Sequence, residues 1–123
     1  MIYRESLSQT SLLRWFKLQY PEIKSLLIGY PAGVNLGVMQ RVRAKAMGLT
    51  AGVPDLQLLV PRFDKESNKY IPGLFIEMKA PQGKVSKIQK DFHDKLRAQN
   101  YTIVISYSSE EAMKEIKEYL KKA

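Results

Sequence analysis

The sequence contains no cysteine and a single histidine, His93, among its 123 residues. The absence of cysteine excludes disulfides, thiolate metal sites and a cysteine nucleophile, and one histidine excludes a multi-histidine zinc site. No apolar run approaches the ~20 residues that a membrane helix needs. The N-terminal residues also show no signal-peptide pattern. We therefore expect an intracellular, cytoplasmic protein that does not associate with membranes.

The composition is that of an ordinary globular domain with an excess of positive charge. Apolar residues make up 45% of the chain, and 20 Lys and Arg outnumber 12 Asp and Glu, which gives a net charge of +8. The length fits one domain over residues 1–123, because domains usually hold roughly 100–200 residues. A basic domain favours a polyanionic partner such as nucleic acid, although solvated lysines give the same total.

Apolar periodicity and turn residues predict eight elements in the order α-β-α-β-β-α-β-α. They are expected over residues 5–19, 25–30, 36–47, 55–60, 74–79, 86–99, 101–107 and 108–120. A helical crossover normally returns the chain parallel to the preceding strand, whereas the two central strands suit an antiparallel pair. The sequence therefore predicts an α/β fold with a mixed sheet flanked by helices.

The first helix carries an apolar stripe that becomes polar toward its N-terminus. Leu12, Phe16 and Tyr20 recur at helical spacing, and steps of four residues backwards reach Gln9 and then Glu5. An acidic residue in a first turn is favoured by the helix dipole, so a solvated first turn explains Glu5 without any function.

The apolar run 25–30 is expected to form a buried strand, and two further helices have defined apolar sides. Apolar residues of the helix 36–47 lie on one side and its cations around the rest, which suits either a phosphate-facing or a solvated surface; they are Val38, Met39, Val42 and Ala46, with Arg41, Arg43 and Lys45. The helix 86–99 is expected to pack through Ile88, Phe92 and Leu96, and Ser86 with Gln89 forms a capping-box pattern.

The connection over residues 61–73 is long and polar. It is close to the ~12–15-residue limit for a segment without secondary structure. A surface loop and a contact site for DNA or a partner both remain open.

An acid and a lysine share one face of the strand 74–79. Because side chains alternate along a strand, Phe75, Glu77 and Lys79 point to the same side. Antiparallel pairing with the strand 55–60 would place Asp55 opposite the end that carries Glu77 and Lys79. The sequence therefore predicts two carboxylates and one ammonium in a single cluster.

Two converging carboxylates are hard oxygen ligands that suit Mg²⁺ or Mn²⁺. A divalent ion there would neutralise charge on a scissile phosphate, and Lys79 would orient water or stabilise developing charge. A salt bridge on a solvated sheet face is the commoner use of such a pair of residues.

The same residues resemble the core motif of the PD-(D/E)xK nucleases, with Pro54-Asp55 followed by Glu77-Met78-Lys79. The fuller pattern is similar to stand-alone VRR-NUC domains of phages and bacteria, and covers nearly the whole chain. It comprises Glu5 and Gln9 before Trp15 and Gln19-Tyr20-Pro21, then Ala51 to Leu56, then Gly73 to Lys79, and finally Gly83 to Ser86 with Gln89.

The resemblance implies a restriction-endonuclease-like fold and a role for each matching residue. Asp55 and Glu77 would be metal carboxylates, the Met78 backbone carbonyl a third ligand, and Lys79 the catalytic lysine. Glu5 would complete the metal site from the first helix, which gives its place on the stripe a functional reason. Gln89 would be the catalytic glutamine of the following helix, with capping as the alternative.

The chain also departs from the family pattern at two places. Residues 31–35 replace an Asn-Gly-Gly stretch, which leaves a role for Asn35 undefined. The Val-Arg-Arg triplet that names the domain is absent, and Arg41-Val42-Arg43 is only a loose echo of it.

By resemblance, the expected activity is that of a Mg²⁺- or Mn²⁺-dependent endonuclease acting as a homodimer on branched DNA, including four-way (Holliday) junctions. Two sites related by a two-fold axis suit symmetric cleavage. Cations expected to follow phosphates without reading bases are Arg41, Arg43, Lys45, Lys84, Lys87 and Lys90. The alternatives are a non-catalytic DNA-binding or assembly module, a flap or duplex nuclease, and a base-specific restriction-like enzyme.

Overall fold

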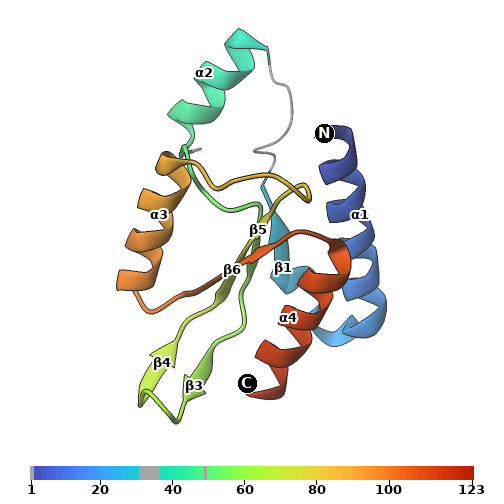
Figure 1. Cartoon of the computed structure of the whole chain (residues 1–123), viewed down its shortest axis with the longest axis vertical. Coiled ribbons are helices and arrows are strands. Elements are labelled where there is room, and N and C mark those ends of the chain that lie inside the picture. The colour runs from blue at the N-terminus through green and yellow to red at the C-terminus, as the bar shows by residue number, and fades with distance from the viewer. Residues whose placement is uncertain (1, 31–36, 49) are drawn as a thin grey trace.

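The computed structural model describes residues 2–30, 37–48 and 50–123, and side chains from residue 9 onward. A four-stranded sheet lies at the centre, with α1 and α4 on one face and α3 on the other (Figure 1). The strand order is β1-β2-β5-β6, and a separate two-stranded sheet is formed by β3 and β4. The elements in chain order are α1 (Ile2–Gln19), the 3₁₀ helix η1 (Pro21–Leu26), β1 (Leu27–Gly29), α2 (Val38–Ala46), β2 (Leu56–Leu58), β3 (Arg62–Asp64), β4 (Lys69–Ile71), β5 (Leu74–Met78), α3 (Lys87–Ala98), β6 (Thr102–Ser106) and α4 (Ser109–Lys121).

The predicted mixed sheet is confirmed by the pairing of its strands. β1 pairs antiparallel with β2, and β2 pairs antiparallel with β5. β5 and β6 are parallel, with Leu74 beside Thr102 and Met78 beside Ser106. The helix α3 makes the crossover between these two parallel strands, as the chirality and length of such connections require.

The core lies on the face of the sheet that α1 and α4 cover. Leu56 and Ile76 are Cα partners across β2 and β5, and both are completely buried. The apolar stripe of α1 packs there through Leu12 and Phe16, which are also completely buried. Because side chains alternate, the neighbouring residues of β5 point to the opposite face, toward α3.

The predicted capping box begins α3, and residues in left-handed conformations follow α2 and α3. The Ser86 hydroxyl accepts from the Gln89 backbone N–H at 3.2 Å, and the Gln89 side chain accepts from the Ser86 N–H at 2.9 Å. Asn100 ends α3 with φ 70°, and Gly48 follows α2 with φ 107°. Both are left-handed backbone conformations that asparagine and glycine tolerate.

The connection 61–73 is a β-hairpin and not a structureless loop. Phe63 of β3 pairs with Tyr70 of β4. The turn is closed by Asp64, whose carboxylate accepts from the Ser67 N–H at 3.1 Å and from its hydroxyl at 2.5 Å. Period-two alternation is too short here to be seen in the sequence, because each strand has three residues.

Two packing predictions are wrong, and the helix α2, for which no packing partner was predicted, has no buried residue. The run 25–30 was expected to be a buried strand, yet only Leu27 of the edge strand β1 is buried. Ile88 of α3 is 60% exposed, whereas Phe92 and Leu96 are half-buried and the buried residue of that helix is His93. α3 therefore packs on the sheet through a face rotated from the apolar stripe.

Tyr119 connects α4 to the residues that follow β2. Its replacement by phenylalanine is expected to lower the free energy of unfolding by about 0.5–1.5 kcal/mol. Its hydroxyl donates to the Val60 carbonyl at 2.6 Å, and the Arg62 guanidinium lies 5.2 Å from the ring centroid. Burial raises the pKa of Tyr119 from 10.0 to about 12. Because the pKa in the folded state is the higher one, this stabilisation is complete below pH 10 and is lost as the pH rises toward 12.

Denaturant unfolding of both proteins at neutral and alkaline pH measures this effect. The stability difference between wild type and Tyr119→Phe is expected to shrink above pH 10. Tyr107→Phe, at a position that is 40% exposed, serves as the control and should leave stability almost unchanged. Equal stability of Tyr119→Phe and wild type at neutral pH would contradict the assigned hydrogen bond.

Candidate active site

Asp55 lies directly before β2, against the end of β5 that carries Glu77. Gln57 and Phe75 are Cα partners, so the alternation that begins at this pair continues to Asp55 and Glu77 on the same face. The Asp55 Oδ2 accepts from the Met78 backbone N–H at 2.7 Å. The predicted juxtaposition of these two acidic residues is therefore confirmed, and it is fixed by the backbone of β5.

The Glu77 carboxylate faces α3 and is almost completely removed from solvent, with 2% of its side chain exposed. Its Oε2 accepts from Gln89 Nε2 at 3.3 Å, and its Oε1 lies 3.2 Å from His93 Nε2. An ionised carboxylate is costly to bury unless polar groups surround it. α3 supplies such groups, and this explains why its polar side chains face the sheet.

Gln89 joins the acid to the lysine. Its Oε1 accepts from Lys79 Nζ at 2.8 Å and from the Ser86 backbone N–H at 2.9 Å, while its Nε2 donates to Glu77. The two readings of Gln89, a helix cap and a site residue, are therefore not exclusive. One amide caps α3 and also connects Glu77 with Lys79.

His93 was not among the residues predicted from the sequence to form the site. Its side chain is 2% exposed and lies beside Glu77. Burial, together with the nearby Arg97 and Lys79 charges, lowers the pKa of His93, whereas Asp94 opposes this effect. The spacing from Gln89 to His93 is four residues, which places both on one face of a helix, and this spacing was the available signal.

The helix-borne acid predicted from the resemblance, Glu5, belongs to α1, but its side chain lies outside the described residues. Gln9, one turn further along, packs against the end of β1. Its Nε2 lies 2.7 Å from the position that a Cβ on Gly29 would take. Gln9 therefore lies beside the edge strand β1, and the role of Glu5 stays a prediction. Asn35 also lies outside the described residues.

The six predicted phosphate-contacting cations are exposed and lie in two groups. Lys84, Lys87 and Lys90 surround the N-terminal end of α3, close to Gln89 in sequence, and Lys87 Nζ is 3.3 Å from Asp91. The other group, Arg41, Arg43 and Lys45, lies on α2, which projects from the molecule (Figure 1). The first group therefore flanks Gln89, whose side chain contacts Glu77, whereas the second group lies on a separate helix.

The donor set around Asp55 and Glu77 suits a hard divalent cation that keeps part of its hydration. Within the described residues, no group of three or more His, Cys, Asp and Glu side chains is placed to hold a metal ion. Mg²⁺ needs no such cage, because it is commonly held by one or two carboxylates, waters and substrate phosphate oxygens. Two acids and a strand-end carbonyl therefore fit Mg²⁺ or Mn²⁺ better than zinc.

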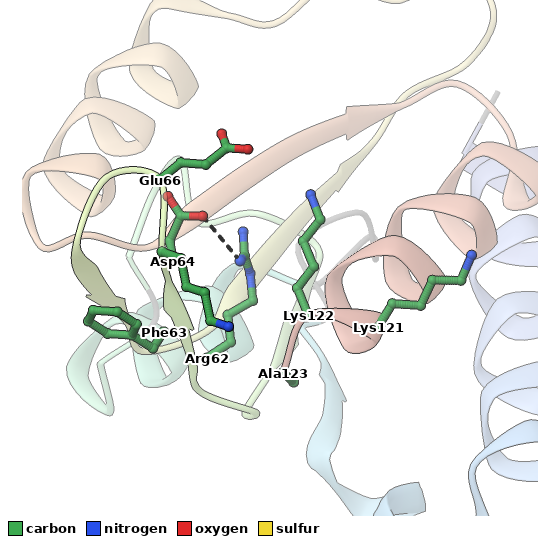
Figure 2. Close-up of a pocket in the computed structure, with 8 residues that line it drawn as sticks. Arg62, Phe63, Asp64, Glu66, Lys121, Lys122 and Ala123 are labelled. Atoms are coloured by element: carbon green, nitrogen blue, oxygen red, sulfur yellow. Dashed lines mark ion pairs between the residues drawn. The ribbon is translucent and has the colours of Figure 1, made fainter.

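A cavity of about 360 Å³ lies elsewhere, between the β3–β4 hairpin and the C-terminal end of α4 (Figure 2). Arg62 and Asp64 form an ion pair of 3.6 Å in its wall. Hydrogen bonds from Ser67, followed by the charge of Arg62, hold the pKa of Asp64 below its usual value. The lining residues are Arg62, Phe63, Asp64, Lys65, Glu66, Lys121, Lys122 and Ala123, so the acidic pair is not part of this cavity.

Gly52 allows the segment before Asp55 to pack closely against α3 at Ile88. Gly52→Ala is expected to reduce both stability and activity. Its φ is 89°, and an added Cβ would lie 2.7 Å from the Ile88 carbonyl oxygen. The backbone conformation alone should cost about 1–2 kcal/mol. The clash would push Asp55 and Gln89 apart. Thermal unfolding measures the first effect and a cleavage assay the second.

Gly37→Ala is the matched control for this substitution, since a Cβ there meets nothing within 4 Å. It should leave both measurements close to wild type. Full stability and activity of Gly52→Ala would show that this contact does not position the site.

Comparison with known proteins identifies the family. The VRR-NUC domain model matches residues 4–110. A solved structure described as a VRR_NUC domain protein superposes with a TM-score of 0.78 at 23% identity, covering 98% of this chain and 90% of that chain, and shares this restriction-endonuclease-like fold. No curated protein shows a match. The resemblance seen in the motifs is thus confirmed, and the chain belongs to the VRR-NUC domain family, a family of nucleases.

Proposed function

We propose that this protein is a Mg²⁺- or Mn²⁺-dependent DNA endonuclease selective for branched structures such as four-way (Holliday) junctions. The observation that carries the proposal is the joint placement of Asp55, Glu77 and Lys79 at the end of β5. Membership of a nuclease family and a net charge of +8 support DNA as the substrate.

In this proposal the acidic residues hold the cation and Lys79 acts on the reacting groups. Asp55 and Glu77, with the Met78 carbonyl and Glu5, are the proposed ligands. A bound divalent cation would supply charge neutralisation at the phosphate and a lowered pKa of coordinated water. The Lys79 ammonium stabilises negative charge that develops on the phosphate, and Gln89 holds this ammonium in place. Water adds to phosphorus as the P–O bond to the leaving strand breaks, the proton lost by the water passes to solvent, and the leaving oxygen takes up a proton from solvent.

A cleavage assay on duplex, flap and four-way-junction DNA, with and without Mg²⁺ or Mn²⁺, tests the proposal. Cleavage is expected only with the metal, and fastest on the junction. Metal-dependent cleavage that favours flaps or duplex would support the nuclease activity but contradict the preference for junctions. Junction binding without any cleavage would instead favour the non-catalytic module. Because phosphate contacts release counterions, binding should weaken steeply as salt rises.

A homodimer is part of the proposal, and a mass of twice 14.1 kDa is expected in sedimentation equilibrium at micromolar protein. One chain offers one acidic pair, whereas paired cuts in a symmetric junction need two. Apolar side chains that are more than half exposed also occur on or next to α2: Val38, Met39, Val42 and Met47. Such surfaces commonly mark association sites. A mass of 14.1 kDa would contradict the two-site arrangement.

Within the described residues, no helix is long and apolar enough to cross a membrane. A cytoplasmic location remains part of the proposal. Fractionation of cells that express the full chain would test it, with the protein expected in the cytosolic fraction.

A further inference from the structure

Two polar residues of α3 reach the two oxygens of one buried carboxylate. His93 Nε2 is 3.2 Å from Glu77 Oε1, and Gln89 Nε2 is 3.3 Å from Glu77 Oε2. The two residues are one helical turn apart, so side chains from a single helix face contact both oxygens of the Glu77 carboxylate. Gln89 belongs to the family pattern described above, whereas nothing so far explains His93.

The contact between His93 and Glu77 lies where water cannot replace it. Both side chains are 2% exposed. An ionised carboxylate only accepts hydrogen bonds, so with Glu77 ionised the hydrogen of this contact is on Nε2 and the imidazole acts as the donor. A buried acceptor that loses such a donor is left with an unmet hydrogen bond. His93 therefore does more than fill space between α3 and the sheet.

We propose that His93 is a positioning residue that fixes the orientation of the Glu77 carboxylate for cation binding. Each carboxylate oxygen has two lone pairs, so an oxygen that accepts a hydrogen bond can also bind a metal. Partners that orient a ligand in this way typically change metal affinity by about 10–100-fold when removed. This inference rests on the proposed function, because it assumes that Glu77 is a ligand.

The position of His93 separates its role from that of the residues nearer the lysine. Gln89 contacts both Glu77 and Lys79, whereas the hydrogen bond of His93 goes to Glu77 Oε1. Loss of His93 should therefore free one end of the carboxylate while the bridge from Gln89 to Lys79 persists. The expected defect lies in cation affinity more than in the rate at saturating cation.

The test measures Mn²⁺ binding by electron paramagnetic resonance, together with cleavage as a function of Mn²⁺ concentration. His93→Phe keeps a ring without the donor and should weaken Mn²⁺ binding by about 10–100-fold, with partial recovery of cleavage at high Mn²⁺. His93→Gln places an amide donor near the former Nε2 and should restore much of the affinity. Asp94→Asn, at an exposed neighbouring residue, is the control and should bind as wild type does.

A purely structural His93 would give a different result. His93→Phe and His93→Gln would then lower the unfolding temperature while Mn²⁺ affinity stayed at the wild-type value, and this outcome would overturn the proposal. If the wild-type protein cleaves DNA and His93→Phe binds Mn²⁺ as tightly as the wild type does, this inference alone is overturned. Wild-type protein that neither binds Mn²⁺ nor cleaves DNA would overturn the proposed function and this inference with it.

Nitrogen-15 NMR of the wild-type imidazole keeps the inference testable if His93→Phe does not fold. The expected spectrum shows a neutral ring with the hydrogen on Nε2, and Glu77→Gln should shift that nitrogen resonance. A hydrogen on Nδ1 with a bare Nε2 would overturn the assigned contact.

Discussion

Glu77→Gln is expected to lower metal-dependent cleavage by at least about 10²–10³-fold while the protein stays folded. The amide has the shape of the carboxylate, and its oxygen can accept from Gln89 while its NH2 donates to a His93 ring that has changed tautomer, so packing around β5 should persist. It loses the negative charge that a divalent cation requires. Mn²⁺ affinity should fall together with activity, and both can be measured on the same preparation.

Glu66→Gln is the matched control for Glu77→Gln, because Glu66 lies exposed in the turn between β3 and β4. It removes the same charge from the chain and should leave cleavage and Mn²⁺ binding unchanged. Cleavage that survives in Glu77→Gln would contradict the assignment of the acidic pair. An equal loss in both variants would point to net charge rather than to a site.

Lys79→Met is expected to lower cleavage by about 10²–10³-fold but to leave Mn²⁺ binding nearly intact. The Lys79 ammonium is held by Gln89 Oε1 at 2.8 Å and is proposed to act on the reacting phosphate or water rather than on the cation. Single-turnover cleavage at saturating Mn²⁺ measures this effect. The separation of chemistry from metal binding distinguishes Lys79 from Glu77.

Lys114→Met, at an exposed position of α4 on the other side of the sheet, is the control and should cleave normally. Wild-type rates for Lys79→Met would remove the lysine from the mechanism. A parallel loss of Mn²⁺ affinity would instead assign Lys79 to the stability of the metal site.

Strand alternation and turn residues were sufficient to place Asp55 beside the end of β5 and to pair β5 with β6. These features depend on local periods and on the crossover rule, which the sequence carries directly. The cap of α3 at Ser86 was likewise predictable, because capping depends on a few adjacent side chains. The order along the chain of the four main helices and of the four strands of the main sheet followed from these signals.

The face of α3 could not be obtained from apolar periodicity. Periodicity assigned Ile88 to the core, but Ile88 is exposed and His93 is buried. The polar side of α3 turns inward because Glu77 on the facing strand needs donors, and this requirement becomes visible only when the two elements meet. The β3–β4 hairpin was missed for a different reason, since strands of three residues carry almost no pattern.

The most direct measurement of the proposed metal site is the anomalous diffraction of crystals soaked with MnCl₂. We expect one strong peak at the end of β5, in contact with the carboxylates of Asp55 and Glu77 and the backbone carbonyl of Met78, and no peak in crystals of Glu77→Gln. A Mn²⁺-active enzyme whose crystals show the peak elsewhere, or an unchanged peak in Glu77→Gln, would contradict the assignment of Asp55 and Glu77 as the metal-binding pair.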